Sequence, residues 1–167
     1  MAEAVSPILE RRRIEAGIVK PIYEELVRQL GAERARAIIS AAVRRDAVAQ
    51  ARNYAESEGG RTSLLSFQKL HEQWKAGGAL EMDVLEETEE RVSYNVTRCR
   101  YAEMYREMGL SEIGHLLSCG RDSVFCTGYD PDITLERTQT IMQGASHCDF
   151  RYRYGRAPER DPSDQGR

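Results

Sequence analysis

The sequence predicts an α+β fold in which N-terminal helices pack on an antiparallel sheet formed by the C-terminal half. Two observations predict it: apolar residues recur at helical spacing through residues 8–77, and they alternate with polar residues, as in strands, after residue 80. The chain has 167 residues, enough for one core. We therefore expect a single domain over residues 1–154, with a helical part at 8–77 and a sheet-and-helix part at 80–154.

Two helices are expected at the start of the chain. Pro21 lacks an N–H and fits the first turn of the first helix, or a kink in it. Gly31 is a good stop signal, and a second helix begins near Ala32. Apolar side chains at every fourth position give the first helix one wide apolar stripe. Its members are Ile18, Ile22, Leu26 and Leu30, with Val19, Tyr23 and Val27 beside them. The residues expected on the buried face of the second helix are Ala35, Ile38, Ile39, Ala42 and Val43.

A loop over Glu56–Thr62 precedes a third helix, which Ser63 or Ser66 caps and Gly77-Gly78 ends. His71 in this helix is expected at the boundary of the core. The period of the pattern then changes to two, which predicts a strand pair around a polar connection at Glu86–Glu90. The apolar residues of this pair are Leu80, Met82, Val84, Val92, Tyr94 and Val96.

Thr97 is typical of an N-cap and predicts a helix that runs to Met108. Ser111 opens a shorter helix to about Leu117. The rest of the chain is expected to form a second strand pair and a polar tail. The strands cover Thr134–Met142 and His147–Tyr154, and residues 155–167 form the flexible tail.

Composition and charge exclude several classes of protein. The chain carries 24 basic and 27 acidic residues, a net charge of −3, which argues against a basic surface for nucleic acid. The longest strongly apolar stretch, Ala37–Val43, is too short to span a membrane. No basic-then-apolar run opens the chain, so we expect a cytoplasmic protein whose four cysteines are thiols. Exposed apolar stripes and strand faces are compatible with a homo-oligomer.

Chemically active side chains cluster between residues 95 and 151, although phosphate-binding, zinc and catalytic-serine motifs are absent. The cysteine spacing is not that of a structural zinc site, so we expect no bound metal and no cofactor. A mixed metal site stays open as a hypothesis, with Cys99, Cys119, Asp122, His147 and Cys148 as its ligands.

Cys99 has two interpretations. In the first turn of a helix capped by Thr97, it would be favoured as a thiolate by the helix dipole and by its arginine neighbours. Alternatively, it is a small buried hydrophobic residue, and the pattern favours this second interpretation.

The stretch from His147 to Tyr152 is the richest in chemistry. Strand alternation places Cys148, Phe150 and Tyr152 on one face and His147, Asp149 and Arg151 on the other. His147 therefore cannot readily serve as the base for its neighbour Cys148, and a Cys–His pair would need a cysteine from another element. The pattern favours core positions for Cys148 and Phe150, with Asp149 and Arg151 as a surface ion pair.

Two segments carry a family resemblance: Asn95-Val-Thr-Arg-Cys-Arg-Tyr-Ala-Glu-Met, continuing to Leu117-Ser-Cys-Gly-Arg-Asp122, and Glu136-Arg-Thr-Gln-Thr-Ile-Met-Gln-Gly-Ala-Ser-His-Cys-Asp-Phe-Arg-Tyr-Arg153. Together they resemble the L-2-amino-thiazoline-4-carboxylic acid hydrolase family. The resemblance covers most of residues 10–154, and Gly144–Arg151 is its most specific part.

The resemblance implies hydrolytic opening of a small cyclic amidine-like ring, which makes a small molecule the expected partner. Asp122 or Asp149 would hold the protonated amidine, and Arg151, Arg98 or Arg121 a substrate carboxylate. Attack would come from water activated by His147 or an acid, or from a thiolate such as Cys119 or Cys148. The expected catalytic residues are Cys119, Asp122, His147 and Cys148; the expected substrate-binding residues are Asn95, Cys99, Thr138, Asp149 and Arg151. Alternatives are a non-catalytic ligand-binding protein of the same fold and a metalloenzyme.

Overall fold

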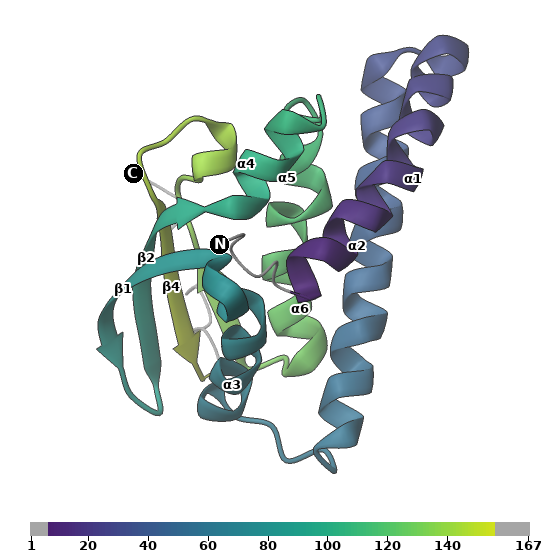
Figure 1. Ribbon diagram of the computed structural model, residues 1–167. Coiled ribbons are helices and arrows are strands. Elements are labelled where there is room, and N and C mark those ends of the chain that lie inside the picture. Colours follow the sequence, from purple (N-terminus) through teal and green to yellow (C-terminus); the bar gives the residue numbers. More distant parts are fainter. Residues whose placement is uncertain (1–6, 156–167) are drawn as a thin grey trace, which may run out of the picture.

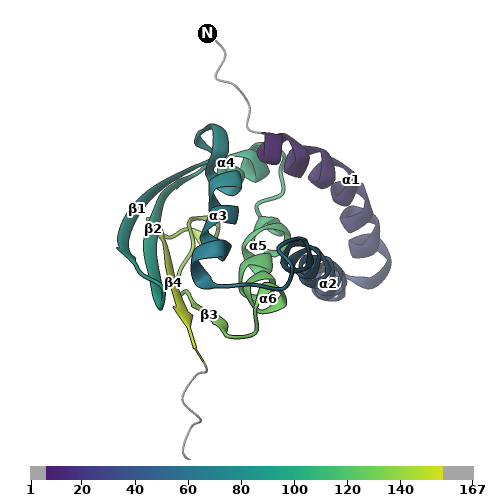
Figure 2. The same cartoon turned by 90° about the horizontal axis from the view of Figure 1, so that it is seen from below.

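The computed structural model describes residues 7–155 and has three layers: a sheet, a middle layer of helices, and two long outer helices (Figures 1 and 2). The expected α+β arrangement is confirmed. Except for Gly155, the predicted tail at 155–167 lies outside the described residues. The elements are α1 (Pro7–Leu30), α2 (Ala32–Ser57), α3 (Leu64–Lys75), β1 (Leu80–Glu87), β2 (Arg91–Cys99), α4 (Arg100–Glu107), α5 (Gly114–Leu117), α6 (Cys119–Tyr129), β3 (Ile133–Glu136), β4 (Cys148–Tyr154) and the 3₁₀ turns η1 (Ala76–Gly78) and η2 (Ile141–Gln143).

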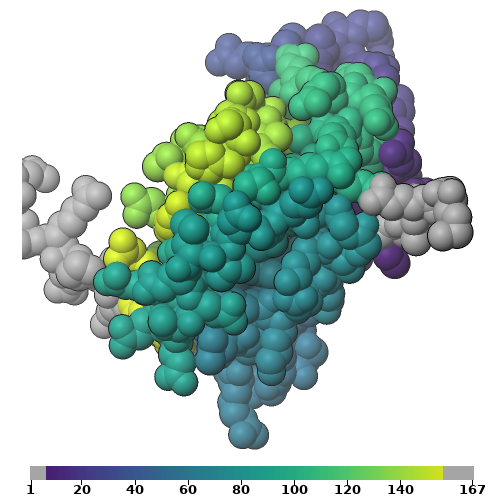
Figure 3. Space-filling view, turned by 60° about the vertical axis from the view of Figure 1, so that its left-hand side comes forward, coloured from purple at the N-terminus to yellow at the C-terminus, as the bar shows by residue number. Residues whose placement is uncertain are grey.

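The sheet has the strand order β1-β2-β4-β3, and every neighbouring pair is antiparallel. Tyr94 lies opposite Phe150 and Val96 opposite Cys148. Because side chains alternate along a strand, this register gathers the apolar side chains of β2 and β4 on the face toward the helices. The side chains of β1 and β2 at the surface of the other face are visible in Figure 3 (teal).

Helices α3 and α6 lie directly on the sheet and supply most of the core. Ser63 caps α3 by accepting a hydrogen bond from the Ser66 N–H, and the Ser66 hydroxyl accepts one from the Ser63 N–H, so the predicted start is confirmed. Phe67 of α3 packs with its ring centroid 5.4 Å from Tyr129 of α6 and 5.3 Å from Tyr152 of β4. Three elements far apart in sequence therefore share one aromatic core.

The helix α2 runs close along α6, because small residues face each other at the contact. Ala47 and Ala51 of α2 are fully buried. A Cβ placed on Gly128 of α6 would lie 3.1 Å from the Ala51 Cβ and 3.2 Å from the Val48 backbone. The two backbones thus approach so closely that a methyl group at position 128 would have to push them apart by a few tenths of an ångström.

The apolar stripe of α1 is only partly buried. Tyr23 and Ala16 pack inward, against the cluster that includes Ile39 of α2 and Met104 of α4. Ile18 and Ile22 on the neighbouring face are 62 % and 50 % exposed. On α2, the expected burial of Ala35 and Ile39 is confirmed, whereas Ile38 and Ala42 are exposed. Both outer helices therefore bury a narrower face than the pattern predicts.

Two sequence predictions of elements are wrong, and one helix was missed. Thr97 does not cap a helix, because β2 continues to Cys99 and α4 begins only at Arg100. The third strand ends at Glu136 rather than Met142, where η2 replaces it. Helix α6 was not predicted. Its apolar residues have no clear one-sided period, because both the sheet and α2 contact it.

His71 lies inside the aromatic core rather than at its boundary. Its ring is 5.0 Å from those of Phe67 and Trp74, and its Nε2 has no hydrogen-bond partner. Burial, with a smaller contribution from Lys75, lowers the pKa of His71 to about 3. The histidine is therefore neutral in the folded protein at any pH near neutrality.

Gly128→Ala is expected to lower the free energy of unfolding by about 1–2 kcal/mol, since the new methyl group forces α2 and α6 apart. Gly17→Ala is the matched control, because a Cβ at Gly17 meets no atom within 4 Å. In an exposed helix this change is expected to add about 0.5–1 kcal/mol. Urea denaturation of both variants tests the contact, and an unchanged or higher stability of Gly128→Ala would contradict it.

The burial of His71 predicts acid sensitivity. In the unfolded chain His71 takes up a proton near pH 6.5, whereas in the folded protein it stays neutral until the pH falls to about 3. The contribution of His71 to stability is therefore fully present above its pKa in the unfolded chain. As the pH drops from 7 to 5, the free energy of unfolding falls by about 2 kcal/mol. His71→Phe is expected to remove most of this slope in urea titrations at each pH. His147→Gln, outside the aromatic core, is the control and is expected to keep the wild-type dependence of stability on pH.

Candidate functional site

A cavity of about 130 Å³ lies between the helix-facing side of the sheet and helices α1, α3 and α6. An engineered apolar cavity of about 150 Å³ is large enough to bind benzene, so this hollow matches a single small ring. Seven aromatic side chains contribute to its wall: Tyr54, Trp74, Tyr94, Tyr101, Phe125, Phe150 and Tyr152.

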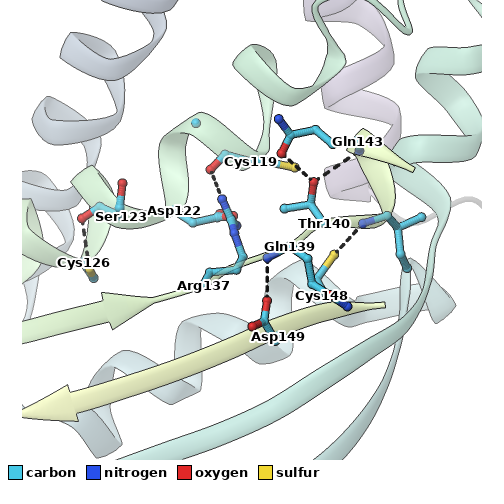
Figure 4. Close-up of polar contacts among 12 residues, drawn as sticks. Cys119, Asp122, Ser123, Cys126, Arg137, Gln139, Thr140, Gln143, Cys148 and Asp149 are labelled. Carbon is cyan, nitrogen blue, oxygen red and sulfur yellow. Dashed lines mark hydrogen bonds and ion pairs between the residues drawn. The ribbon is translucent and has the colours of Figure 1, made fainter. Parts of the chain in front are cut away.

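An ion pair forms the polar part of the cavity wall. Asp122, in the first turns of α6, accepts a hydrogen bond from Arg137, the residue directly after β3 (Figure 4). The Arg137 guanidinium also donates to the Cys119 carbonyl at 2.9 Å, and its carbon lies 5.0 Å from the centre of the Phe150 ring. Three partners thus fix Arg137 over the cavity. Burial raises the pKa of the Asp122 carboxyl, and Arg137 opposes that rise.

Three thiols line the same cavity: Cys99 at the end of β2, Cys119 at the start of α6 and Cys148 at the start of β4. The Cys148 Sγ accepts a hydrogen bond from the Ile141 N–H at 3.2 Å. Burial raises the pKa of all three thiols, that of Cys99 to about 11. They are therefore protonated at neutral pH in the empty cavity. Cys99 precedes α4, and the helix dipole does not make it a thiolate.

The fourth cysteine, Cys126, is buried outside the cavity and donates its S–H to the Ser123 carbonyl. Of the nine sequence-predicted site residues, the cavity brings together four: Cys99, Cys119, Asp122 and Cys148.

The other five lie outside the cavity lining. His147 contacts the Gln139 side chain at 3.2 Å, and Asn95 accepts from Arg151 at 2.9 Å. Asp149 and Arg151 do not form the expected ion pair. Arg151 donates to backbone carbonyls of β2 and β4 instead, and Asp149 accepts from the segment after Arg137. The predicted alternation is confirmed for Cys148, Phe150 and Tyr152, which all face the cavity.

Asp149 holds that segment in place. It accepts hydrogen bonds from the Thr138 N–H and hydroxyl and from the Gln139 N–H, the last at 2.8 Å (Figure 4). Burial acts to raise the pKa of Asp149, but these hydrogen bonds outweigh it and bring the pKa below its ordinary value. A charged Asp149 therefore fixes the backbone next to Arg137.

Sequence reasoning missed Arg137 and the aromatic wall. Arg137 lies within the second matched segment, but nothing in its spacing distinguishes it from the other arginines of the chain. Of the arginines proposed to bind a substrate carboxylate, Arg98 is exposed and bonded to Glu103, and only Arg121 lines the cavity. The strand alternation that placed Phe150 and Tyr152 on one face was the available signal for part of the wall.

A second hollow of about 400 Å³ lies between α1 and α2 and shares Arg11, Arg12, Gln50 and Arg121 with the first. Arg121 is buried and donates to Asp46 and Gln50, each at 3.0 Å. Arg12 is bonded to Glu15. Arginine side chains therefore form the boundary between the two hollows.

Within residues 7–155, no group of three or more histidine, cysteine or acidic side chains is arranged to hold a metal ion. No described helix combines the length and the apolar character that a membrane crossing requires.

The chain was compared with known proteins. Among solved structures, the phenol-responsive sensory domain of the transcription activator PoxR, crystallised with phenol, is similar at 14 % identity and a TM-score of 0.49, over 92 % of this chain and 76 % of that one. No curated protein matches the sequence. The sequence model described as L-2-amino-thiazoline-4-carboxylic acid hydrolase matches residues 11–152, which include every residue of the Asp122–Arg137 wall. The chain therefore belongs to the L-2-amino-thiazoline-4-carboxylic acid hydrolase family.

Proposed function

We propose that this protein is a hydrolase that opens one small amidine- or amide-like ring, such as an aminothiazoline carboxylate, with water activated by Asp122. The observation that carries the proposal is the Asp122–Arg137 ion pair in the wall of a cavity that matches a single ring. Membership of the family supports hydrolase chemistry in general. The ring size and the catalytic role of Asp122 are inferred from the cavity.

The cavity wall can bind a planar ring and leave its edge for chemistry. Aromatic faces such as those of Tyr94 and Phe150, which stack with centroids 4.9 Å apart, favour a flat ligand by offset stacking. The carboxylate of Asp122 is the cavity's buried anion, and it suits a protonated amidine through a charge-assisted hydrogen bond. A substrate carboxylate would find Arg121 and Arg12 at the boundary with the second hollow.

The chemical step follows from these positions. Asp122 accepts a proton from water, and the hydroxide adds to the ring carbon that lies between two heteroatoms. Addition to the protonated amidine gives a neutral adduct, and the negative charge that forms on the leaving atom as its bond breaks is stabilised by Arg137, which is already oriented by the Cys119 carbonyl and the Phe150 ring. The bond from that carbon to a ring heteroatom then breaks, and Asp122 returns its proton to the leaving atom. One water molecule is consumed and the ring is opened.

A thiol route is the second candidate, because Cys119 and Cys148 line the same cavity. Their raised pKa values mean that a base must remove the thiol proton before attack. Among the described residues that line the cavity there is no histidine, so Asp122 would have to be that base. The water route needs one proton transfer fewer, and we favour it for that reason.

The remaining predicted site residues take supporting roles in this proposal. Thr138 and Asp149 position Arg137 through the hydrogen bonds that hold residues 138–139. Arg151 and Asn95 bridge the two central strands behind the cavity. His147 has no role in the step.

Asp122→Asn is expected to lower kcat by about 10²–10⁴-fold, because an amide cannot accept the proton from water. The amide can still accept the Arg137 hydrogen bond but leaves the guanidinium charge unpaired, so a lower melting temperature and weaker binding of a protonated amidine are expected, while binding of the neutral rings persists. The assay follows thiol or ureido product from aminothiazoline carboxylate, cyclic ureas and hydantoins, with thermal shift as the binding readout. Wild-type activity is expected to rise with pH through the raised Asp122 pKa.

Asp83→Asn, which changes an exposed carboxylate on β1, is the control and is expected to keep full activity. Wild-type binding of such rings without any product would identify a ligand-binding protein and contradict the hydrolase proposal. Full activity of Asp122→Asn would contradict its role as the base.

The three cavity thiols are expected to react slowly with a thiol reagent at pH 7, at rates that rise about tenfold per pH unit below their pKa values. A bound ring is expected to protect Cys99, Cys119 and Cys148. Cys126, buried elsewhere, is the internal control whose labelling the ring leaves unchanged. Mass spectrometry of each labelled cysteine measures these rates. One cavity cysteine that reacts fast at pH 7, combined with loss of turnover in its alanine variant, would establish the thiol route instead.

A further inference from the structure

The outward face of α1 carries an apolar ridge that no described residue covers. Ile14, Ile18 and Ile22 are 59 %, 62 % and 50 % exposed, although they recur at the four-residue spacing of a helix surface that normally packs. In Figures 1 and 2, α1 lies at the edge of the molecule away from the sheet, and the exposure of the three isoleucines identifies the face of the helix that points outward. Scattered exposed apolar residues are ordinary in proteins, whereas a continuous ridge marks an interaction surface.

The charges at the two ends of the ridge are opposite and symmetrically placed. Arg11 precedes Ile18 by seven residues, and Glu25 follows it by seven. Because seven residues make about two helical turns, both residues lie on the same face of the helix as Ile18. Both side chains are largely exposed, at 57 % and 49 %. The ridge therefore runs from a cation through three isoleucines to an anion, with Ile18 at its centre.

We propose that a second copy of this chain docks on this ridge, with the two α1 helices antiparallel about a two-fold axis at Ile18. In this arrangement Ile18 meets Ile18 of the second copy, and Ile14 meets its Ile22. Arg11 then meets Glu25 of the second copy, and the reverse contact forms at the other end, as a two-fold interface requires. A parallel arrangement would instead place like charges together. Because the apolar and charged residues of the ridge are complementary to those of a second ridge in this arrangement, a second copy is favoured over an unrelated apolar partner.

Local features of α1 suit this close contact. Gly17 lies beside the ridge with open space where a Cβ would be, so a second helix can approach the backbone there. In the single chain Arg11 is bonded to Glu15, and Glu25 to Arg28. Exposed ion pairs of this kind contribute little to stability, so the side chains can turn to new partners at low cost. Arg11 also lines the cavity, so the second copy would border the candidate site.

Sedimentation velocity over a concentration series tests the dimer. The wild-type protein is expected to change from monomer to dimer as the concentration rises, and Ile18→Glu is expected to weaken the dimer by about 100-fold or more, since it places a charge at the centre. Leu85→Glu, at a 58 % exposed site on β1, is the control and is expected to dimerise like wild type. A wild-type protein that stays monomeric at all concentrations, or an Ile18→Glu protein that dimerises normally, overturns the proposal.

A charge swap tests the antiparallel register. Arg11→Glu and Glu25→Arg are each expected to weaken the dimer by about tenfold, and the double variant is expected to restore it, because each end again joins opposite charges. Failure of the double variant to recover overturns the register. Ile18 is exposed, so these readings do not depend on the fold of the single chain, which circular dichroism verifies.

Oxidation of Ile18→Cys provides a second measurement. A residue on the two-fold axis faces its own copy, so this variant is expected to form a disulfide-linked dimer much faster than Leu85→Cys. Equal rates for the two variants overturn the proposed axis.

Discussion

The ion pair of Asp122 with Arg137 is the interaction on which the candidate site depends. It joins α6 to the segment after β3, and the two residues together form the polar part of the cavity wall. A buried charge that loses its partner costs about 3–5 kcal/mol, so neither side chain can be placed here alone. The Cys119 carbonyl, the Phe150 ring and the Asp149-bound loop all restrict the same guanidinium. The polar part of the cavity is therefore built around one cation.

The cavity and the outer surface are connected through α1. This helix buries Tyr23 and Ala16 on one side, presents Arg12 to the two hollows, and leaves its isoleucine ridge, with Arg11 at one end, outward. One helix of 24 residues thus serves the core, the site and the proposed dimer on three faces. Because these faces are rigidly coupled by the helix itself, docking of a second copy next to Arg11 would restrict the helix that borders the cavity.

Most elements could be predicted from local pattern. The caps of α3, the stop at Gly31 and the alternation of β2 and β4 depend on residues close in sequence, and the structure confirms them. Predictions failed where contacts between residues far apart in sequence determine the local structure. Helix α6 has no single apolar face because α2 and the sheet cover it from different sides, and Cys99 stays in β2 because pairing with Leu80 extends the strand beyond the apparent cap at Thr97.

By itself the sequence determined the α+β class, the family segments and the common face of Cys148, Phe150 and Tyr152. Each of these depends on periodicity or motif, which neighbouring residues fix. Only the tertiary structure decided which charged side chain pairs with Asp122 in the cavity wall. In the folded protein Arg137 bonds to Asp122, whereas Arg98 and Arg151 have other partners. Asp149 bonds to the Gln139 backbone, outside the cavity lining, and His71 is buried in an aromatic cluster. The physical reason is that a side chain's partner, and hence its charge state, is set by residues that folding brings near, often from far along the chain.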